Sequence, residues 1–222
     1  MFDAILLIAG RGERTRLPYN KVFYKIDGKP VFLRPLKKFL ELDECERVVI
    51  VAAQDEMDVA KEAVRSLNSL KIIFVSGGER RQDSVENGMR MCVNEVVLIH
   101  DGARVMIEKP YIMAVSETMK SFHSAALAVR VTDTIREMKG GKMRMLDRDG
   151  LYAMQTPQGV RRNEYLRAAA LAQNDNYFGT DDVELIEKYL SIPPVLVEGS
   201  YDNFKVTNIQ DIRRLEAVME GE

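Results

Sequence analysis

Residues 4–12 read AILLIAGRG, a short apolar run that ends in two closely spaced glycines. A continuous apolar run of this length that stops at glycine is typical of a strand buried on both faces of a sheet. We therefore predict a buried strand over residues 4–9. Glycines directly after such a strand let backbone N–H groups approach phosphate oxygens, so the following loop is a candidate anion-binding site.

Strand-like and helix-like segments alternate downstream of this run. The expected strands are rich in β-branched residues, and the expected helices have apolar residues at helical spacing. This alternation indicates an α/β fold with a Rossmann-like, mostly parallel sheet, helices on both faces and right-handed crossovers. We expect strands at 47–53, 71–75, 95–100 and 124–131 and helices at 30–40, 56–67, 83–93 and 108–121.

The alternation stops between residues 131 and 150, where the chain reads VTDTIREMKGGKMRMLDRDG. Gly140 and Gly141 separate two weakly alternating runs, which is the signature of a β-hairpin. Because a two-stranded hairpin is marginal by itself in water, we expect a protruding arm at about 132–150 that packs on a second subunit. A solvated surface loop is the alternative interpretation.

The remaining chain returns to helices and short strands. We expect helices at 161–172, 182–190 and 208 to about 219, and short strands at 194–197 and 203–207. Thr180, Asp181 and Asp182 offer an N-cap and acidic residues where the helix dipole favours them. Neither an internal repeat nor a low-complexity linker divides the sequence, so we expect a single domain over residues 1–222 that carries the arm.

The composition excludes several classes of protein. The 222 residues include 32 Lys and Arg and 34 Asp and Glu, a net charge of −2 that argues against a nucleic-acid coat protein or a polybasic membrane binder. The first apolar run is too short for a signal peptide, and no run reaches the roughly 18–20 residues of a membrane span. Cys45 and Cys92 have no metal-site spacing. We therefore expect a cytoplasmic protein without nucleic-acid or membrane partners.

The loop over residues 9–21 reads AGRGERTRLPYNK. It matches neither GxxxxGKS/T nor GxGxxG, and a tight strand-to-helix turn would explain the two glycines alone. In an open α/β sheet, however, ligands bind beyond the carboxyl ends of the strands. There, Arg14 and Lys21 would add positive charge to a polyanion site.

Further segments make the prediction of a ligand-binding site at this edge of the sheet more specific. Each follows an expected strand or lies in an expected connecting loop, where α/β active sites are built. They are GGERRQDSV at 77–85, HDGAR at 100–104, TPQ at 156–158 and DNFKVT at 202–207. Shorter motifs accompany them: DT at 133–134, DRDGL at 147–151, TDD at 180–182 and VEG at 197–199.

In this set and order of motifs, the chain resembles the 2-C-methyl-D-erythritol 4-phosphate cytidylyltransferase family of nucleotidyltransferases, over nearly its whole length. The resemblance implies transfer of CMP from CTP to 2-C-methyl-D-erythritol 4-phosphate, with release of pyrophosphate, in non-mevalonate isoprenoid biosynthesis. It also implies a divalent ion, usually Mg²⁺, and a homodimer whose arms interlock. The attacking phosphate oxygen is already an anion, so the task is positioning and electrostatic stabilisation.

The resemblance implies a role for individual residues. The catalytic positions would be Arg14, Lys21, Arg148 and Lys205. The nucleotide-binding positions would be Ala9, Gly10, Gly12, Gly78, Arg81, Ser84, Asp101 and Gly102. The substrate-binding positions would be Asp101, Arg104, Thr134, Arg148, Thr156 and Lys205.

Within these sets, the backbone at Gly78 and the hydroxyl of Ser84 would read cytosine, although a helix N-cap is the alternative role of Ser84. Thr134 and Arg148 on the arm would reach the substrate phosphate of the neighbouring subunit. Mg²⁺ would be held mainly by CTP phosphates rather than by a protein cage, with Asp101 as the alternative ligand. We expect His100 to be structural and His123 to lie at a helix end on the surface.

Several positions depart from the usual residues of the family. Ile8 stands for an alanine near the cytosine, Gly102 for the first alanine of HDAARP, and Val105 for its proline. Residues 20–22 read NKV where PKQ is usual. These changes leave the charged positions intact and bear on the fit around base and ribose.

Alternatives stay open. A pentitol-phosphate cytidylyltransferase, such as one that uses ribitol 5-phosphate, shares most of these motifs. A sugar-1-phosphate nucleotidyltransferase that uses another nucleotide is disfavoured by the segment at 77–85. A CTP-binding regulatory module, or a mere dimerisation scaffold, would not need Arg14, Lys21 and Lys205 together.

Overall fold

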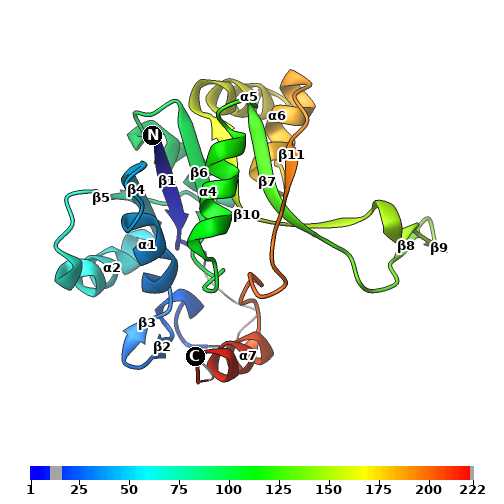
Figure 1. Ribbon diagram of the computed structural model, residues 1–222. Coiled ribbons are helices and arrows are strands. Elements are labelled where there is room, and N and C mark those ends of the chain that lie inside the picture. The colour runs from blue at the N-terminus through cyan, green and yellow to red at the C-terminus, as the bar shows by residue number, and fades with distance from the viewer. Residues whose placement is uncertain (11–16, 221–222) are drawn as a thin grey trace.

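The computed structural model describes residues 1–10 and 17–220, and within them a seven-stranded sheet forms the centre of the molecule (Figure 1). The strand order is β11-β7-β10-β6-β1-β4-β5. β1 (Phe2–Leu7) pairs in parallel with β4 (Cys45–Ala52) on one side and with β6 (Val96–Asp101) on the other. β5 (Ile72–Ser76) continues the parallel set beside β4. The predicted mostly parallel, Rossmann-like sheet is therefore confirmed.

β10 (Tyr152–Arg161) is a strand that the hydrophobic pattern does not predict. It runs antiparallel between β6 and β7 (Ser124–Arg130), whose other neighbour is the parallel β11 (Val195–Glu198). Pro157 argues against a central strand because proline cannot donate to the ladder. Here the ladder to β7 shifts register next to it, between Met154 and Gln158. The expectation of a connecting loop at 156–158 is therefore wrong.

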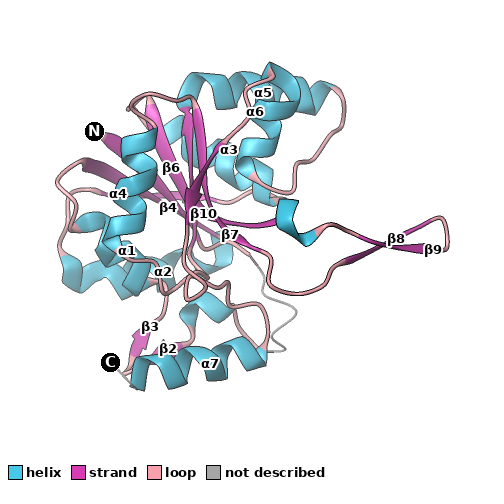
Figure 2. Ribbon diagram, turned by 45° about the vertical axis from the view of Figure 1, so that its right-hand side comes forward, coloured by secondary structure: helices cyan, strands magenta, loops and turns pink. Residues whose placement is uncertain are grey.

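Helices cover both faces of the sheet, as predicted (Figure 2). Ala4 and Leu6 of β1 face α1, α2 and α4, whereas Ile5 faces α3, α5 and α6. Because successive strand residues point to opposite faces, burial of both faces explains the unbroken apolar run in β1. The helices are α1 (Leu33–Leu40), α2 (Met57–Val64), α3 (Arg81–Met91), α4 (Lys109–Thr118), α5 (Arg162–Asn174) and α6 (Asp182–Leu190). Single 3₁₀ turns lie at Lys21–Phe23, Gln54–Glu56, Arg65–Leu67 and Arg148–Gly150.

The last helix, α7 (Ile209–Glu220), lies beside the short hairpin of β2 (Lys25–Ile26) and β3 (Lys29–Pro30), apart from the central sheet (Figure 2). It belongs to a third, smaller apolar core, in which the buried Val105 takes part. The helix expected from residue 30 begins instead at Leu33, because Pro30 pairs within the β2–β3 hairpin.

Residues 203–207, expected as a strand, are irregular. The backbone N–H of Val206 donates to the carbonyl of Ala103 at 2.9 Å. The N–H groups of Thr207 and Asn208 donate to Asp211 Oδ2, at 2.7 and 3.0 Å. The N–H groups of Thr207 and Asn208, which in a strand would pair with a neighbouring strand, therefore cap the start of α7 instead.

The expected hairpin arm is present. β8 (Arg136–Lys139) and β9 (Lys142–Met145) form an antiparallel pair that projects from the body of the molecule (Figures 1 and 2). Gly140 and Gly141 at its turn have φ values of +57° and +75°. Positive φ at both central residues is what a tight hairpin turn requires, and glycine adopts it without strain.

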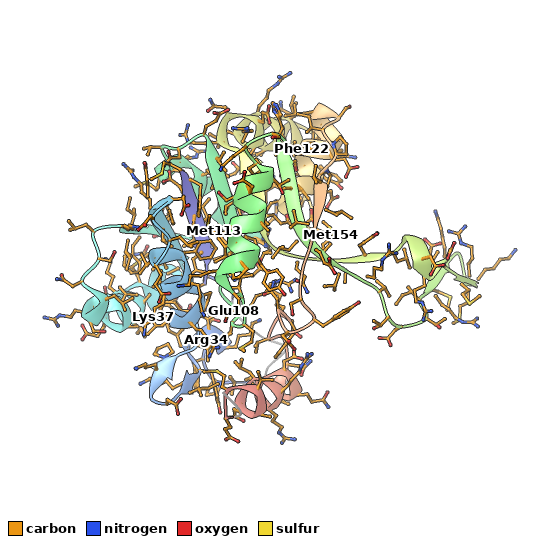
Figure 3. All side chains as sticks on the ribbon, in the orientation of Figure 1. Arg34, Lys37, Glu108, Met113, Phe122 and Met154 are labelled. Atoms are coloured by element: carbon orange, nitrogen blue, oxygen red, sulfur yellow. The ribbon has the colours of Figure 1, made fainter. Side chains whose placement is uncertain are left out.

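An ion-pair group joins α1 to the start of α4 (Figure 3). Glu108 lies 2.6 Å from Lys38 Nζ and 3.9 Å from Arg34 Nη2. Glu108 immediately precedes α4, where the helix dipole favours a carboxylate. Because the three side chains are partly exposed, the contact contributes only about 0.2–1 kcal/mol.

The ends of β1 and β6 approach too closely for a side chain at Gly102. The N–H of Gly102 donates to the carbonyl of Leu7 at 2.8 Å. A Cβ at position 102 would lie 2.6 Å from Ile8 Cγ2. The two departures from the usual alanines therefore compensate each other, because the larger Ile8 uses the space that Gly102 leaves free.

This packing predicts a coupled effect on stability. Gly102→Ala should lower the free energy of unfolding by about 1–3 kcal/mol through overpacking. The same substitution should cost less in an Ile8→Ala background, because the methyl group in the way is gone. Urea unfolding of the wild type, both single variants and the double variant measures the coupling. Strict additivity would contradict the proposed packing.

Candidate active site

The segments that follow four parallel strands meet at one edge of the sheet. The N–H of Ile8 donates to the carbonyl of Val51, and the N–H of Gly77 to that of Ala52. Ala9 and Gly10, which we expect to be nucleotide-binding positions, continue from Ile8 at this edge. The carboxyl ends of strands are where open α/β sheets bind ligands.

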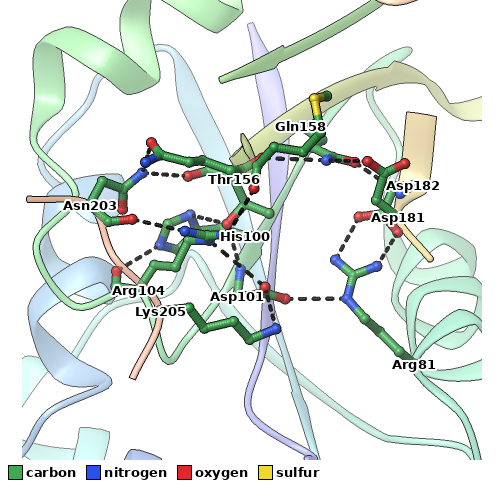
Figure 4. Close-up of polar contacts among 12 residues, drawn as sticks. Arg81, His100, Asp101, Arg104, Thr156, Gln158, Asp181, Asp182, Asn203 and Lys205 are labelled. Carbon is green, nitrogen blue, oxygen red and sulfur yellow. Dashed lines mark hydrogen bonds and ion pairs between the residues drawn. The ribbon is translucent and has the colours of Figure 1, made fainter. Parts of the chain in front are cut away.

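Asp101, the last residue of β6, collects cationic side chains at this edge (Figure 4). Its Oδ2 lies 2.8 Å from Lys205 Nζ, and its Oδ1 accepts from Arg81 Nε at 3.2 Å. Burial alone would raise the pKa of Asp101, but the charges of Arg81, Lys205 and Arg104 outweigh it and lower that pKa below its usual range. Asp101 is therefore an ionised carboxylate that joins cations from distant parts of the chain.

Arg81 also contacts a second carboxylate. Its Nη1 and Nη2 donate to the two carboxylate oxygens of Asp182, each at 2.7 Å. The sequence predicts Asp182 as a helix-terminus residue and as part of the TDD motif at 180–182, but not this contact with Arg81. The contact brings the first residues of α3 and α6 together beside β6 (Figure 4).

The loop at 77–84 is held by its own serine. Ser84 Oγ accepts from the N–H of Gly78 at 3.0 Å and donates to the carbonyl of Arg80 at 3.0 Å. α3 begins at Arg81, so Ser84 lies inside the first turn and is not the N-cap. With its proton committed to Arg80, the remaining hydrogen-bonding capacity of this hydroxyl is an acceptor lone pair.

Lys21 is held at the same edge by its neighbour Asn20, which sequence reasoning missed. Asn20 Nδ2 donates to the carbonyl of Ile8 at 2.7 Å and to Glu56 Oε2 at 2.9 Å, and its Oδ1 accepts from Val22 N at 3.3 Å. Asn20 therefore caps the turn that begins at Lys21. An Asx residue directly before a helical turn is the signal that could have identified it.

His100 and Thr156 are buried behind Asp101. Thr156 Oγ1 accepts from the N–H of Asp101 at 3.1 Å and lies 3.0 Å from His100 Nδ1, while His100 Nε2 lies 3.1 Å from the carbonyl of Arg104. This network assigns the proton to Nε2, with Nδ1 accepting from the threonine. Full burial lowers the pKa of His100 to about 4, so it is neutral and structural. The hydroxyl of Thr156 therefore hydrogen-bonds to Asp101 and His100, and its expected contact with the substrate stays a prediction.

Arg104 is likewise committed to the backbone. Its Nη1 donates to the carbonyl of Asn203 at 2.9 Å and its Nη2 to that of Met154 at 3.1 Å. Arg104 thus fixes the segment that carries Lys205 next to β10.

The remaining expected residues lie elsewhere. Thr134 and Arg148 belong to the arm, which projects away from the central sheet in Figure 1. Arg148 Nη1 donates to the carbonyl of Thr132 at 2.9 Å, beside a hollow of about 330 Å³ at the base of the arm. Gly12 and Arg14 lie outside the described residues.

Within residues 1–10 and 17–220, no group of three or more His, Cys, Asp or Glu side chains could hold a metal ion. In the same residues, no helix combines the length and apolar character needed to cross a bilayer.

Comparison with known proteins shows which family the chain matches. The model of the 2-C-methyl-D-erythritol 4-phosphate cytidylyltransferase family matches residues 2–221. The enzyme of that name from Bacillus velezensis is 35% identical, covering 100% of this chain and 97% of the relative. That from Aquifex aeolicus is 34% identical, covering 99% and 98%.

Solved structures agree in fold. The crystal structure of 2-C-methyl-D-erythritol 4-phosphate cytidylyltransferase from Thermus thermophilus has a TM-score of 0.80 at 26% identity and covers 99% of this chain and 100% of that one. A 4-diphosphocytidyl-2C-methyl-D-erythritol synthase from Anaerococcus prevotii has a TM-score of 0.88 at 24% identity and covers 99% and 96%.

The buried His100 predicts a specific loss of stability on acidification. Because its pKa is lower in the folded protein than in the unfolded chain, its contribution is complete above about pH 6.5 and is lost as the pH falls toward about 4. Between pH 7 and 5 this group should remove roughly 2 kcal/mol of unfolding free energy. Urea unfolding of wild type and His100→Gln at both pH values measures it. The variant should lose less than the wild type, and equal losses would contradict the assignment.

Proposed function

The chain belongs to the 2-C-methyl-D-erythritol 4-phosphate cytidylyltransferase family, and we propose that the edge of the sheet around Asp101 is where it transfers CMP from CTP to 2-C-methyl-D-erythritol 4-phosphate. The observation that carries this proposal is the Asp101 cluster. One buried carboxylate presents Arg81 and Lys205 beside the glycine-containing segment that follows β1. Two polyanionic reactants need such a concentration of positive charge at strand ends.

The chemistry requires little more than positioning. A phosphate oxygen of the acceptor forms a bond to the α-phosphorus of CTP, and the bond from that phosphorus to pyrophosphate breaks. The nucleophile enters as an anion and no proton has to be removed. Lys21 and Lys205 supply N–H donors to phosphate oxygens as charge redistributes, and Arg14 joins them by the family resemblance.

The base loop supports selection of cytosine. Ser84 can offer an acceptor lone pair, because its proton is bound to the carbonyl of Arg80. The exocyclic amine of cytosine is a donor and satisfies that lone pair. The corresponding carbonyl of uracil is an acceptor. It would face the lone pair of Ser84 without a hydrogen between them, and the cost of two unpaired buried acceptors would disfavour binding of UTP.

The residues fit a metal ion that arrives with the nucleotide. Both oxygens of Asp101 are engaged by Arg81 and Lys205, so the carboxylate is occupied by cations without a direct metal contact. Mg²⁺ keeps several waters and is commonly bound through substrate phosphates. Mg²⁺ bound to CTP would neutralise charge on phosphate oxygens, while Lys21 and Lys205 orient them.

The arm supports a homodimer. Met138, Met143 and Met145 are each more than half exposed, at 63%, 56% and 63%. A two-stranded hairpin with so much exposed apolar surface is marginal by itself. A second copy of the chain would bury this surface, and Thr134 and Arg148 would then approach the partner's reactants.

Two further expectations stay proposals. The continuous sheet from β1 to β11 supports one domain over residues 1–222 with the arm at about 132–150. Cys45 and Cys92 are free and buried, which suits a reducing cytoplasm.

Release of pyrophosphate tests the function. Purified protein with Mg²⁺ and CTP should release it rapidly with 2-C-methyl-D-erythritol 4-phosphate, and slowly with ribitol 5-phosphate. ATP, GTP and UTP serve as controls for the base, and only CTP should support turnover. Preference for ribitol 5-phosphate would move the protein to the pentitol-phosphate class. No release with either acceptor, despite CTP binding, would favour a regulatory module.

Mixed dimers test the role of the arm. Lys21→Ala and Arg148→Ala should each lower turnover by orders of magnitude, because each removes a charge from every site. When the two variants are mixed, half of the dimers would be hybrid with one intact site, so activity should recover to about a quarter of wild type. Subunit exchange must be verified by mass spectrometry of the hybrid. Exchange without recovery would contradict an arm that acts across the interface.

A further inference from the structure

The Arg81 side chain bridges two carboxylates with different parts of its guanidinium. Both terminal nitrogens contact Asp182, each at 2.7 Å, and Nε contacts Asp101 Oδ1 at 3.2 Å (Figure 4). The Oδ2 of Asp101 thereby remains available to Lys205, which lies 2.8 Å from it. Four side chains from α3, α6, β6 and the segment before α7 thus form one chain of alternating charge.

Asp182 is the immobile end of this chain. Its side chain is 1% exposed, and it is the first residue of α6. The N–H groups of Asp182 and Val183 donate to Gln158 Oε1, at 2.9 and 3.2 Å, from the buried centre of β10. Gln158 of β10 therefore fixes the backbone at Asp182. The short, buried side chain then keeps the carboxylate in place.

We propose that Asp182 is a positioning residue for Lys205, acting through Arg81 and Asp101. A guanidinium prefers to meet a carboxylate with two parallel N–H donors. With Asp182 holding the two terminal nitrogens, the guanidinium is oriented so that only its Nε hydrogen-bonds to Asp101. Without Asp182, the guanidinium would turn toward Asp101, engage both of its oxygens and displace the ammonium of Lys205.

The inference rests on the proposed function at one point, namely that Lys205 contacts the reacting phosphate. Loss of the Asp182 charge makes the cluster more positive, so attraction of CTP should be kept or increased. Misplacement of Lys205 should lower turnover, because displacements of about 1 Å in a positioned group cost up to about a hundredfold. Damage to the site in general would instead weaken CTP binding as well.

Asp182→Asn and Asp181→Ala make a matched pair for the test. Asp182→Asn keeps the shape of the side chain and removes the charge that holds Arg81. Asp181→Ala removes the neighbouring carboxylate, which caps α6 through the N–H of Glu184 and contacts Gln158 but not Arg81. The control therefore weakens the same helix end without releasing the guanidinium.

Two measurements are made on each protein. The first is steady-state turnover, reported as kcat and as KM for CTP. The second is the rate at which acetic anhydride modifies Lys205 in the free enzyme, followed by peptide mass spectrometry. For Asp182→Asn we expect kcat to fall about tenfold to a hundredfold, an unchanged or lower KM, and faster modification of Lys205. For Asp181→Ala we expect lower thermal stability with wild-type kcat and modification rate.

The outcomes separate this inference from the proposed function. Wild-type kcat and Lys205 reactivity in Asp182→Asn would overturn it, and so would equal changes in Asp181→Ala. If the wild type does not turn over CTP, the modification rates alone decide, since they report the geometry of the free enzyme. If Asp182→Asn does not fold, Arg81→Lys keeps the positive charge but removes the paired N–H donors of the guanidinium. Its Lys205 should then be modified no faster than in the wild type, because no guanidinium remains to displace it from Asp101, and faster modification would contradict the inference.

Discussion

The buried carboxylate of Asp101 is the contact on which the site depends. Arg81, Lys205 and Arg104 come from three separate parts of the chain and would repel one another without it. A buried charge is tolerated only when it is paired and hydrogen-bonded, and removing one partner of such a pair typically costs about 3–5 kcal/mol. The same carboxylate therefore holds three segments together and keeps their positive charges at the edge where phosphates would bind.

The order of the strands explains how the chain supplies both a site and an arm. β10 lies between β6 and β7, so the chain leaves β7, forms the projecting hairpin and returns through the middle of the sheet. The return places Thr156 behind Asp101 and Gln158 beneath the start of α6. Arm and site are thus joined by one strand, and the arm projects away from the central sheet (Figure 1).

What the sequence predicts and what it misses follow from how local each signal is. The parallel strands and the glycine turn of the arm were predictable, because periodicity and turn chemistry act over a few residues. β10 was missed because Pro157 interrupts its hydrophobic pattern. Residues 203–207 were misassigned because their short apolar alternation resembles a strand, whereas N–H groups at the end of this segment cap α7. Asp182 was recognised as a helix-end residue, but its partner Arg81 lies 101 residues earlier. Local sequence carries no signal for such a pairing.

A crystal structure of the protein with CTP and Mg²⁺ tests the central claim most directly. Cytosine should contact the backbone at Gly78 and the hydroxyl of Ser84, and the triphosphate should contact Lys21 at the end of β1. Lys205 should lie within hydrogen-bond distance of the α-phosphate, with Arg81 still bound to Asp101. A nucleotide bound away from the carboxyl ends of β1 and β6, or one whose phosphates touch neither lysine, would contradict the account.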